Sequence, residues 1–535
     1  MTKILTSFKI IVVVLVIAIS SVANGQTNTW TLVKGADSSS APAVYGKEGK
    51  PSHSNTPGPR TNPLTWVDAH NNLWMFGGGV DGEFDYKGDL WKYSPHSKEW
   101  TWISGSDTNN SYGNYSVKGI PSDSVMPANR SAGVSWTDSA GNLWLFGGVQ
   151  TFVAGDDVWK YDIHRKQWTW VNGRVTSGNN PPPIPVYGTK GIGAITNTPG
   201  TRVVATGWTG KDGLFWLYGG VGVDDNLGYG DYNDLWNYNS ATNEWTWVSG
   251  ATAVHGTANY GIQGTPSSAN NPGSRFSAAH WVDATGNLWL FGGSDQNATY
   301  FKNDLWKYNI STNEWTWIKG SDVINQNGIY GTLGIPADTN TPGAREFSAY
   351  WTDANGDFWL FGGQNFGSLN PDNSMLNDLW KYSVATNQWT WMGGSTQVDP
   401  ENVQGSPYAR FQAACWTDNK GSFWMYGGQV GNTFADGLWK YTPDLTDATT
   451  NITATINPVN SASLTVYPNP SNGQFTVSLL QASQLTVYNS LGQLIVTQNM
   501  QAGQQLLNLG YQPSGVYSLI VTNGQTQQAI KLVVE

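Results

Sequence analysis

The sequence predicts an all-β chain: a six-bladed β-propeller closed by an N-terminal strand, followed by a small immunoglobulin-like β-sandwich. Three observations lead to this prediction. A unit with room for four short strands recurs six times within residues 26–441. The chain has 63 Gly and 29 Trp but only 12% charged residues, which favours short strands and tight turns over helices. Its last part lacks Trp and alternates apolar with polar residues, as half-buried strands do.

The first 25 residues have the pattern of an export signal. Lys3 and Lys9 precede the apolar run Ile10–Ile19, and small residues follow up to Gly25. This run is too short to span a bilayer comfortably, so we predict a cleaved signal peptide over residues 1–25, with an uncleaved anchor as the alternative. No other stretch is apolar enough to cross a bilayer, and we expect no transmembrane segment in the mature chain.

Each repeat unit reads as four strands, named a to d. Strand a runs from an Arg to a Trp six positions later, such as Arg275 to Trp281, and the turn Asp283–Asn287 follows. Asp and Gly in this turn supply the side-chain hydrogen bond and the positive φ that a hairpin needs. Strand b is apolar on both faces and ends in Gly-Gly. Strand c is of the type Asp304–Tyr308, and strand d is Trp-Thr-Trp, as at Trp315–Trp317.

Four-stranded sheets repeated around an axis leave only short, protected strand edges, which is the propeller solution to the edge problem. Every Trp except Trp30 occupies a repeated position in strand a, b, c or d. Each Trp buries on the order of 150–250 Å², so these side chains are the predicted core. The Trp residues of strand b are Trp74, Trp144, Trp216, Trp289, Trp359 and Trp424.

The sixth unit lacks its own strand d, and the missing strand is predicted at the mature N-terminus. Residues 27–37 read TNTWTLVKGAD, and residues 312–322 read TNEWTWIKGSD. This alignment places Trp30 at the position of Trp315. We therefore expect residues 27–35 to add as the outer strand of the sixth blade and to clasp the ring. Closing a loop of this length costs on the order of 5 kcal/mol, and burial of Trp30 and its neighbours returns a similar amount.

These features resemble the kelch repeat: Gly-Gly after strand b, Asp-Leu-Trp in strand c, the Trp of strand d and the Arg before strand a. The resemblance covers residues 28–441. The units depart from the family in length, because ordinary kelch units have about 50 residues. In this chain the connection from strand d to the next strand a is expanded.

The expanded connections leave on the same face as the connections from strand b to strand c, so one face is predicted to carry all long loops. Loops on a rigid scaffold are where binding usually occurs, and we expect a glycan or an extracellular protein as the ligand. Candidate binding residues are those that recur in the loops. An alternative is that the Arg side chains bridge loop carbonyls or neighbouring blades and that the Tyr side chains anchor the loops. The candidates are Arg60, Arg130, Arg202, Arg275, Arg345, Arg410, Tyr45, Tyr112, Tyr187, Tyr260 and Tyr330.

Two acidic loops break the sixfold pattern and could hold calcium, because carboxylate oxygens are its preferred ligands. The first contains Asp81, Glu83 and Asp85. The second, in the third unit, has a similar run of carboxylates. A solvated acidic loop is the alternative, and no other cofactor is predicted. The second loop contains Asp224, Asp225 and Asp231. Three further loop residues also occur in one unit each and are weaker site candidates: His53, Arg174 and His255.

Charge and residue types limit the remaining functions. The net charge is −10 with a pI near 5.1, which argues against nucleic acid as a partner. The fold is similar to that of kelch-type copper oxidases, but the six His have no metal-ligand spacing, and Cys415 reads as a small buried residue. We therefore favour a non-catalytic binding protein. The alternative is a carbohydrate oxidase, hydrolase or epimerase at the axial mouth, where the ring of Arg would hold an acidic sugar.

A Thr-, Asn- and Ser-rich linker over residues 442–463 leads to the C-terminal module, residues 464–535. The module resembles the C-terminal sorting domain of the type IX secretion system through Tyr467–Pro470, Gly473, Gly515–Tyr517 and Lys531–Val534. A plain accessory β-sandwich is the alternative. The resemblance implies that the type IX machinery is a partner. It also implies translocation across the outer membrane and a product that is secreted or held at the outer cell surface.

Overall fold

The computed structural model describes residues 28–37, 41–80, 85–150, 153–175, 181–225, 228–295, 300–365, 374–400, 405–444, 465–479, 482–489, 494–523 and 526–534. All elements in these ranges are strands, in agreement with the predicted all-β class. None of these residues belongs to a helix long and apolar enough to cross a membrane. The chain divides into two compact units between Pro443 and Asp444. The predicted signal peptide, residues 1–25, and most of the predicted linker lie outside the described residues.

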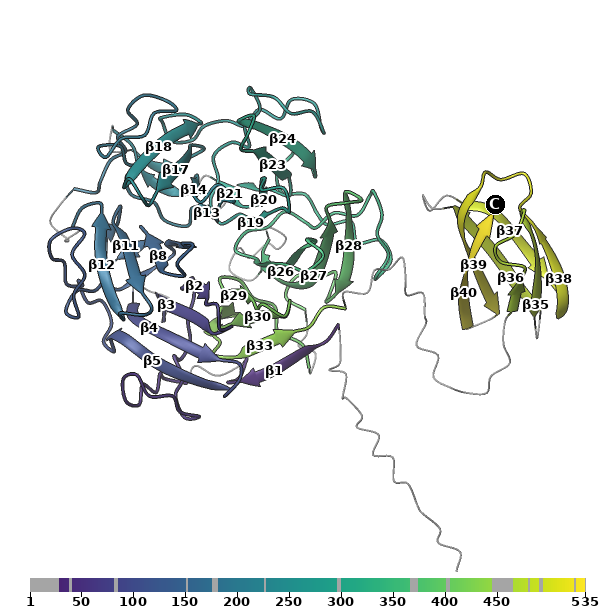
Figure 1. Ribbon diagram of the computed structural model, residues 1–535, viewed down its shortest axis with the longest axis horizontal. Helices are drawn as coiled ribbons and strands as arrows, with labels where there is room; N and C mark the ends of the chain where they lie inside the picture. The colour runs from purple at the N-terminus through teal and green to yellow at the C-terminus, as the bar shows by residue number, and fades with distance from the viewer. Residues whose placement is uncertain are drawn as a thin grey trace, which may run out of the picture. The chain divides into compact units, whose positions relative to one another are not determined.

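The first unit contains, within the described ranges, six four-stranded antiparallel sheets, which we number in chain order of their inner strands (Figure 1). Sheet one consists of β2 (Leu64–Val67), β3 (Leu73–Gly79), β4 (Tyr86–Ser94) and β5 (Glu99–Ser106). Sheet two consists of β7 (Val134–Thr137), β8 (Leu143–Phe146), β11 (Val158–Asp162) and β12 (Gln167–Asn172). Sheet three consists of β13 (Thr206–Thr209), β14 (Phe215–Tyr218), β17 (Leu235–Asn239) and β18 (Glu244–Ser249).

Sheet four consists of β19 (Ala279–Val282), β20 (Leu288–Phe291), β23 (Leu305–Asn309) and β24 (Glu314–Lys319). Sheet five consists of β25 (Ala349–Thr352), β26 (Phe358–Gln364), β27 (Met375–Ser383) and β28 (Gln388–Gly393). Sheet six consists of β29 (Ala414–Thr417), β30 (Phe423–Tyr426), β33 (Leu438–Tyr441) and β1 (Trp30–Lys34). Short strands extend the connections between strands b and c: β9 (Val149–Gln150), β10 (Val153–Ala154), β15 (Val221–Val223), β16 (Tyr229–Asp231), β21 (Ser294–Asp295), β22 (Tyr300–Phe301), β31 (Gln429–Val430) and β32 (Thr433–Phe434). One further short strand, β6 (Arg130–Ser131), precedes strand a of sheet two and pairs with β9.

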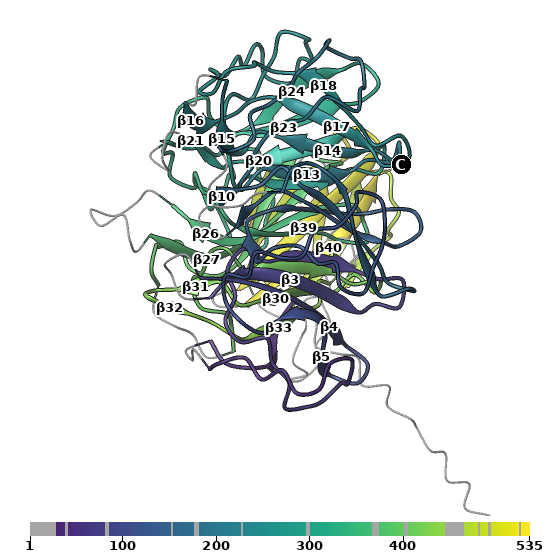
Figure 2. The ribbon, with the colours of Figure 1, turned by 90° about the vertical axis from the view of Figure 1, so that its left-hand side faces the viewer.

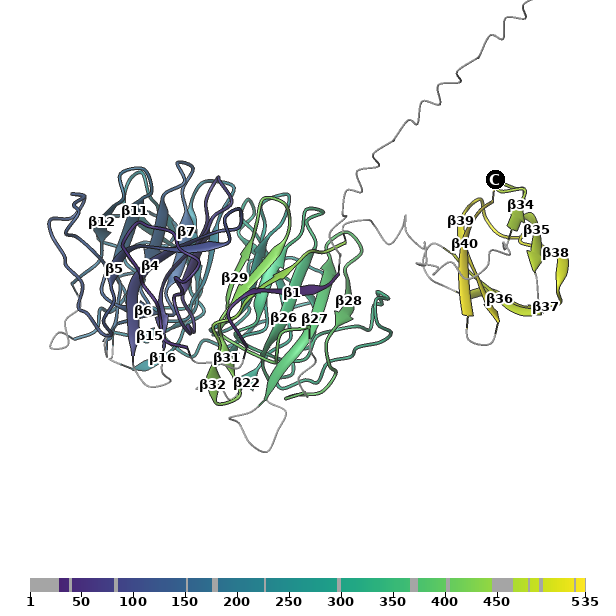
Figure 3. The same ribbon diagram turned by 90° about the horizontal axis from the view of Figure 1, so that it is seen from below.

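The sheets stand around a central axis, as in a β-propeller. Each innermost strand contacts the innermost strands of both neighbours, and the series β2, β7, β13, β19, β25 and β29 closes on itself. Figures 2 and 3 show the hairpins β15–β16 and β31–β32 on the same face of this unit. Because strands a to d alternate in direction, the connections from d to a begin on that face too.

A ring of backbone hydrogen bonds surrounds the axis, and we call it the backbone ring. In each sheet the residue two positions after the repeated Arg donates its N–H to the carbonyl of the equivalent residue in the preceding sheet, at 2.8–3.1 Å. All six residues have φ between 46° and 61°, which ends the extended conformation there. Strand a therefore begins later than predicted, at Leu64 in sheet one. The six residues are Asn62, Ala132, Val204, Ser277, Phe347 and Gln412.

The predicted Trp core lies between neighbouring sheets. Trp136 of sheet two stacks on Phe215 of sheet three, with ring centroids 5.2 Å apart. Its indole N–H donates to the carbonyl of Trp216 at 3.2 Å. Since a buried indole N–H needs an acceptor, this repeated bond fixes the spacing of the sheets. The glycine pairs after strand b have a related role: a side chain on Gly427 would lie 2.6 Å from the Arg60 carbonyl of the next sheet.

The N-terminal strand closes the sixth sheet, as predicted. β1 pairs antiparallel with β33, with Trp30 opposite Tyr441 and Leu32 opposite Trp439. The hydroxyl of Tyr441 donates to Oδ1 of Asn28 at 3.2 Å. In sheet four the same contact lies within one turn, where Tyr308 donates to Asn313 at 2.8 Å. The N-terminal segment thus reproduces a local turn contact from the far end of the chain.

The N-terminal segment also supplies a carboxylate that sheet six lacks. Five sheets have an Asp at the start of strand c, but sheet six has Gly437 there. Asp37 takes the place of the missing side chain: Oδ1 accepts from the Trp439 indole at 2.5 Å, and Oδ2 lies 2.5 Å from Arg410. A side chain on Gly437 would lie 2.7 Å from Asp37 Oδ1. The absence of a side chain at position 437 therefore makes room for Asp37.

The expanded connections cover the outer edges of sheets one to five. In sheet one the Gly49 N–H donates to the carbonyl of Trp102 at 2.8 Å, and Ser52 forms a bridge with Trp100. Sheets two to five repeat the first bond from Gly119, Gly191, Gly264 and Gly334. A shared binding face formed by these loops stays a prediction. Part of each loop lies along strand d, because an open strand edge carries backbone groups that need partners.

The second unit consists of two antiparallel sheets around its own hydrophobic core. One sheet has the order β34 (Thr465–Tyr467), β35 (Gln474–Leu479), β38 (Gly503–Asn508). The other has the order β37 (Leu494–Met500), β36 (Ser483–Asn489), β39 (Gly515–Asn523), β40 (Thr526–Val534). Phe475 and Leu507 from the first sheet share one core with Val487 and Leu519 from the second. This unit therefore has a core independent of the Trp-rich sheets.

Candidate functional site

The six repeated Arg side chains lie inside the protein, at 0–1% exposure. Each pairs with a carboxylate: Arg130 Nη2 is 2.8 Å from Asp157, and Arg345 Nη1 is 2.6 Å from Asp378. The Arg residues also donate to main-chain carbonyls, as Arg130 does to Gly147 at 2.9 Å. The six Arg residues therefore do not form a ring that is free to attract anions. Burial requires each charge to be paired, and the alternative of bridging loop carbonyls describes their contacts. The pairs are Arg60–Asp89, Arg130–Asp157, Arg202–Asp234, Arg275–Asp304, Arg345–Asp378 and Arg410–Asp37.

Four of the five candidate Tyr residues anchor the expanded connections to the same carboxylates. Tyr45 donates its hydroxyl to Asp89 at 2.8 Å and packs between Trp91 and Trp102, with centroids 5.2 and 5.1 Å away. Burial raises the pKa of Tyr45, and the Asp89 charge adds to this effect. The Tyr45 hydroxyl is therefore a neutral donor, and the Tyr45 ring packs against Trp91 and Trp102. Tyr187, Tyr260 and Tyr330 make the equivalent bonds to Asp234, Asp304 and Asp378.

Tyr112 differs from the other four. It is 58% exposed, and Tyr115, three positions later, takes the anchoring role by donating to Asp157 at 2.6 Å. Tyr115 also packs edge-on against Trp159 and Trp170. The Tyr-Gly dipeptide at Tyr112 therefore misidentified the anchor of the second unit. The number of residues between the Trp-Thr-Trp of the preceding strand d and the Tyr would have pointed to Tyr115.

Only part of the first acidic loop belongs to the described residues. Asp81 and Glu83 lie outside the described residues, and the Asp85 carboxylate accepts from the side-chain amides of Asn109 and Asn110 at 3.0 and 2.7 Å. In the second loop, Asp224 accepts from the Gly228 N–H at 2.7 Å. Within the described ranges no three His, Cys, Asp or Glu side chains gather as a metal site would require. Calcium binding by Asp81, Glu83 and Asp85 remains a prediction.

The other loop residues unique to one unit are scattered. His53 is 81% exposed and lies 3.6 Å from Glu99. The Arg174 Nε lies 3.6 Å from Asp156, a carboxyl whose pKa is raised by burial to about 6. His255 Nδ1 lies 2.9 Å from Asp231, and Asp225 is exposed. These contacts are on different sheets and do not converge on one site.

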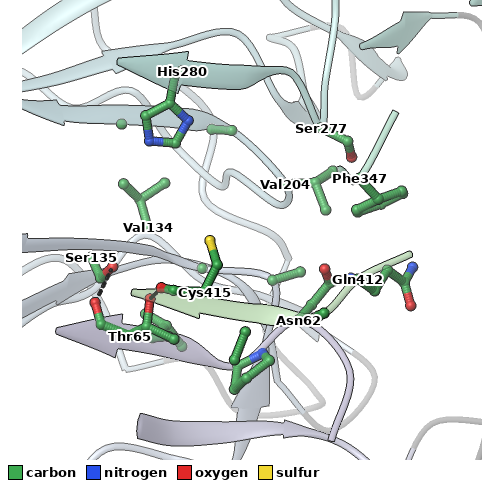
Figure 4. Close-up of a pocket in the computed structure, with 18 of the residues that line it drawn as sticks. Asn62, Thr65, Val134, Ser135, Val204, Ser277, His280, Phe347, Gln412 and Cys415 are labelled. Atoms are coloured by element: carbon green, nitrogen blue, oxygen red, sulfur yellow. Dashed lines mark hydrogen bonds between the residues drawn. The ribbon is translucent and has the colours of Figure 1, made fainter. Parts of the chain in front are cut away.

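A pocket of about 160 Å³ lies on the axis of the ring and is lined by two tiers of side chains (Figure 4). The first tier belongs to the backbone ring, which lies at the start of strand a on the loop-bearing face. The second tier lies three positions further along each strand a, immediately before its Trp. In Figure 4, Asn62, Ser277, Phe347 and Gln412 lie at one end of the pocket, and His280 and Cys415 at the other. The second tier is Thr65, Ser135, Gly207, His280, Tyr350 and Cys415.

The second tier brings together three titratable side chains from three neighbouring sheets. His280 Nε2 is 2.9 Å from the Tyr350 hydroxyl. Burial lowers the pKa of His280 to about 4, so its ring is neutral at physiological pH. Burial likewise raises the pKa of Cys415 to about 11, so it is a thiol and not a thiolate. The predicted small buried Cys is thus a wall residue of the pocket, and this tier is uncharged.

Backbone strain is concentrated at the first tier. Val204 and Phe347 both have φ of 52°, although branched and bulky side chains disfavour the left-handed region. Such a conformation costs on the order of 1–3 kcal/mol. The hydrogen bonds of the backbone ring stabilise it, with the Val204 N–H donating to Ala132 at 2.8 Å. The strain therefore turns six different side chains toward one space on the axis.

Sequence reasoning missed this site, although a signal was present. Both tiers occupy fixed positions in strand a, yet each position has a different residue in all six units. Positions that pack between the sheets recur, as the Trp residues do. A strand a position next to the axis at which the residue changes from unit to unit was therefore the sign that its side chains line a pocket.

Comparison with known families gives two matches. Residues 257–461 match the family model described as the KLHDC2/KLHL20/DRC7 Kelch-repeats domain. Residues 465–535 match the model described as the secretion system C-terminal sorting domain. The chain therefore carries kelch repeats followed by a sorting domain of the type IX secretion system, as the resemblances predicted.

Proposed function

We propose that this chain, which carries kelch repeats and a secretion sorting domain, is a six-bladed extracellular binding propeller without catalytic activity. Its ligand is a glycan or an extracellular protein that approaches the loop-bearing face and reaches the axial pocket. The six four-stranded sheets are its blades, and the C-terminal unit is an immunoglobulin-like sandwich recognised by the type IX machinery. Kelch repeats suggest protein binding, and the sorting domain supports secretion or an outer-surface location.

One observation carries the binding proposal. The residues that recur in every unit are occupied within the scaffold, whereas the residues that differ between units line the axial pocket. Asp, Glu, Lys and Arg are absent from the lining formed by described residues. A site with neutral donors and acceptors and no charged acid–base pair is suited to holding a ligand more than to transforming it.

The test is a glycan array and a panel of extracellular proteins, probed with the mature chain from residue 26. The C-terminal unit alone, residues 465–535, is the negative control, because it has its own core. We expect binding by the mature chain and none by the control. If the mature chain binds no glycan and no protein on either panel, the proposed function is wrong.

A carbohydrate-modifying enzyme at the axial mouth is the second candidate, because His280 and Tyr350 are hydrogen-bonded next to Cys415 in the pocket. An enzyme whose ring of Arg holds an acidic sugar lacks support, since all six Arg are buried against carboxylates. Turnover of a carbohydrate by the purified chain, lost in His280→Ala together with any bound metal, would favour the enzyme over the binding protein.

A further inference from the structure

The axial pocket is neutral, and this limits the chemistry of its ligand. An ion that enters it would lose hydration without meeting an opposite charge, which is strongly unfavourable. His280 and Cys415 do not change this, because burial keeps the pKa of His280 near 4 and that of Cys415 near 11. The pocket therefore favours a ligand that is uncharged and forms hydrogen bonds.

The first tier offers polar side chains that the scaffold does not use. The Ser277 hydroxyl is buried and makes no hydrogen bond with any described residue. Asn62 and Gln412 line the same pocket, and no hydrogen bond from either side-chain amide to a described residue is found. A buried hydroxyl without a partner costs roughly 1–3 kcal/mol, and a ligand that completes the bond would offset this cost.

The second tier contrasts with the first because its polar groups are already engaged. Ser135 donates to the Thr65 carbonyl at 3.1 Å, and Thr65 donates to the Cys415 carbonyl at 3.3 Å. His280 and Tyr350 are bonded to each other. This tier therefore forms the floor of the pocket, and the available donors and acceptors lie at the mouth.

The mouth combines these polar groups with an aromatic ring. Phe347 lines the pocket in the same tier as Asn62, Ser277 and Gln412, and its ring is held by Phe411 at a centroid distance of 6.1 Å. Amides and hydroxyls can both donate and accept, which suits a ligand with several hydroxyls. A pyranose has such hydroxyls at its rim and an apolar C–H face that packs on an aromatic ring.

We propose that the axial pocket binds a single neutral sugar ring, with Asn62, Gln412 and Ser277 at its hydroxyls and Phe347 against its apolar face. This inference rests on the glycan branch of the proposed function and names the ligand class of that site. The volume of about 160 Å³ suits one ring, because pockets for larger ligands measure roughly 300–1,000 Å³. A free monosaccharide and the terminal residue of a glycan share this chemistry.

The experiment titrates the mature chain with methyl glycosides of neutral hexoses, with uronic acids, and with neutral oligosaccharides, using calorimetry or ligand-observed NMR. We expect neutral glycosides to bind and uronic acids to bind at least tenfold more weakly. Tighter binding of oligosaccharides than of methyl glycosides identifies a glycan terminus as the ligand. Equal binding identifies a free monosaccharide.

Three variants test the contacts. Asn62→Ala and Gln412→Ala each remove one amide and are expected to weaken binding about five- to tenfold. Asn71→Ala is the matched control, because Asn71 also has a positive φ but lies in the turn between strands a and b. Ser277→Ala is the sharpest test: it should weaken binding while leaving the melting temperature unchanged or higher, since it removes an unpaired buried hydroxyl.

Three outcomes would overturn this inference. The first is binding of acidic sugars in preference to neutral ones. The second is glycan binding that none of the three variants weakens, which leaves the proposed function standing and places the glycan elsewhere. The third is the absence of any glycan binding together with protein binding on the panel, which retains only the protein branch of the proposed function.

Discussion

Sheet six and the other five sheets have the same architecture but are assembled differently. In sheets one to five, four consecutive strands supply the Arg, the Asp of strand c and the Trp pair of strand d. Sheet six takes its outer strand, β1, and its carboxylate, Asp37, from the opposite end of the chain. Gly437 marks the vacated position. The fold therefore requires an Arg–carboxylate pair at each start of strand c, whichever part of the chain supplies it.

The two kinds of sheet also differ at the outer edge. Strand d of sheets one to five is covered by the expanded connection, as Gly49 and Ser52 cover β5. Within the described residues no bridge covers the outer edge of β1, and Leu32 is 41% exposed. Sheet six is therefore the sheet on which changes should have the largest effect on stability.

Removal of residues 27–35 should have the largest effect. It takes away β1 and with it Trp30, whose ring lies 5.2 Å from Phe361 and 5.1 Å from Tyr441. The ring of sheets would then be open at an edge with unpaired backbone groups. We expect the melting temperature to fall by on the order of 10 °C, measured by circular dichroism or calorimetry. An unchanged melt would refute the clasp.

Asp37→Ala should come next, since it leaves Arg410 buried without a counter-charge. Breaking a buried ion pair in this way costs about 3–5 kcal/mol, measurable by chemical denaturation. Gly437→Asp alone should also destabilise, because its side chain would meet Asp37. The double variant D37G/G437D moves the carboxylate to the position it has in sheets one to five. Recovery of stability in the double variant would confirm the equivalence, and strict additivity of the two losses would contradict it.

Glu346→Gln tests a buried carboxylate at the contact with Ser294 of β21. Glu346 is buried at 2% exposure, follows the repeated Arg, and accepts from Ser294 at 2.5 Å. Burial raises its pKa from 4.5 to about 7. The unfolded chain releases this proton near pH 4.5 and the folded chain only near pH 7, so stability is lost as pH rises through this window. Glu346→Gln should gain about 3 kcal/mol at pH 8 and nothing at pH 4. An equal gain at both pH values would exclude ionisation as the cause.

The smallest effect distinguishes two Tyr residues in the same loop. Tyr115→Phe removes the hydroxyl bonded to Asp157 and should lower the free energy of unfolding by about 1 kcal/mol. Tyr112→Phe should leave it unchanged, because Tyr112 is largely exposed. Denaturation midpoints of the two variants, measured side by side, check this. A greater loss for Tyr112→Phe would mean that Tyr112, and not Tyr115, anchors this loop.

Recurrence explains which features could be predicted from the sequence. The strands, the Trp core and the closing role of Trp30 follow from positions that repeat in every unit, because each sheet must pack in the same way. The axial pocket depends on Asn62, Phe347 and Gln412, which share a position in the repeat but are three different residues. The role of Asp37 could not be predicted either, because its partner Arg410 is remote in the chain. The only sign in the sequence is Gly437, which stands where the other five sheets have the Asp of strand c.

The backbone ring has an electrostatic consequence for whatever approaches the axis. Its six N–H groups all donate in the same rotational sense, from each sheet to the one before it. Dipoles directed along the circumference of a circle have a vector sum near zero. A helix end, by contrast, aligns its peptide dipoles toward one point and attracts ions. The backbone ring therefore has no positive or negative end, and its own dipoles draw neither cations nor anions along the axis.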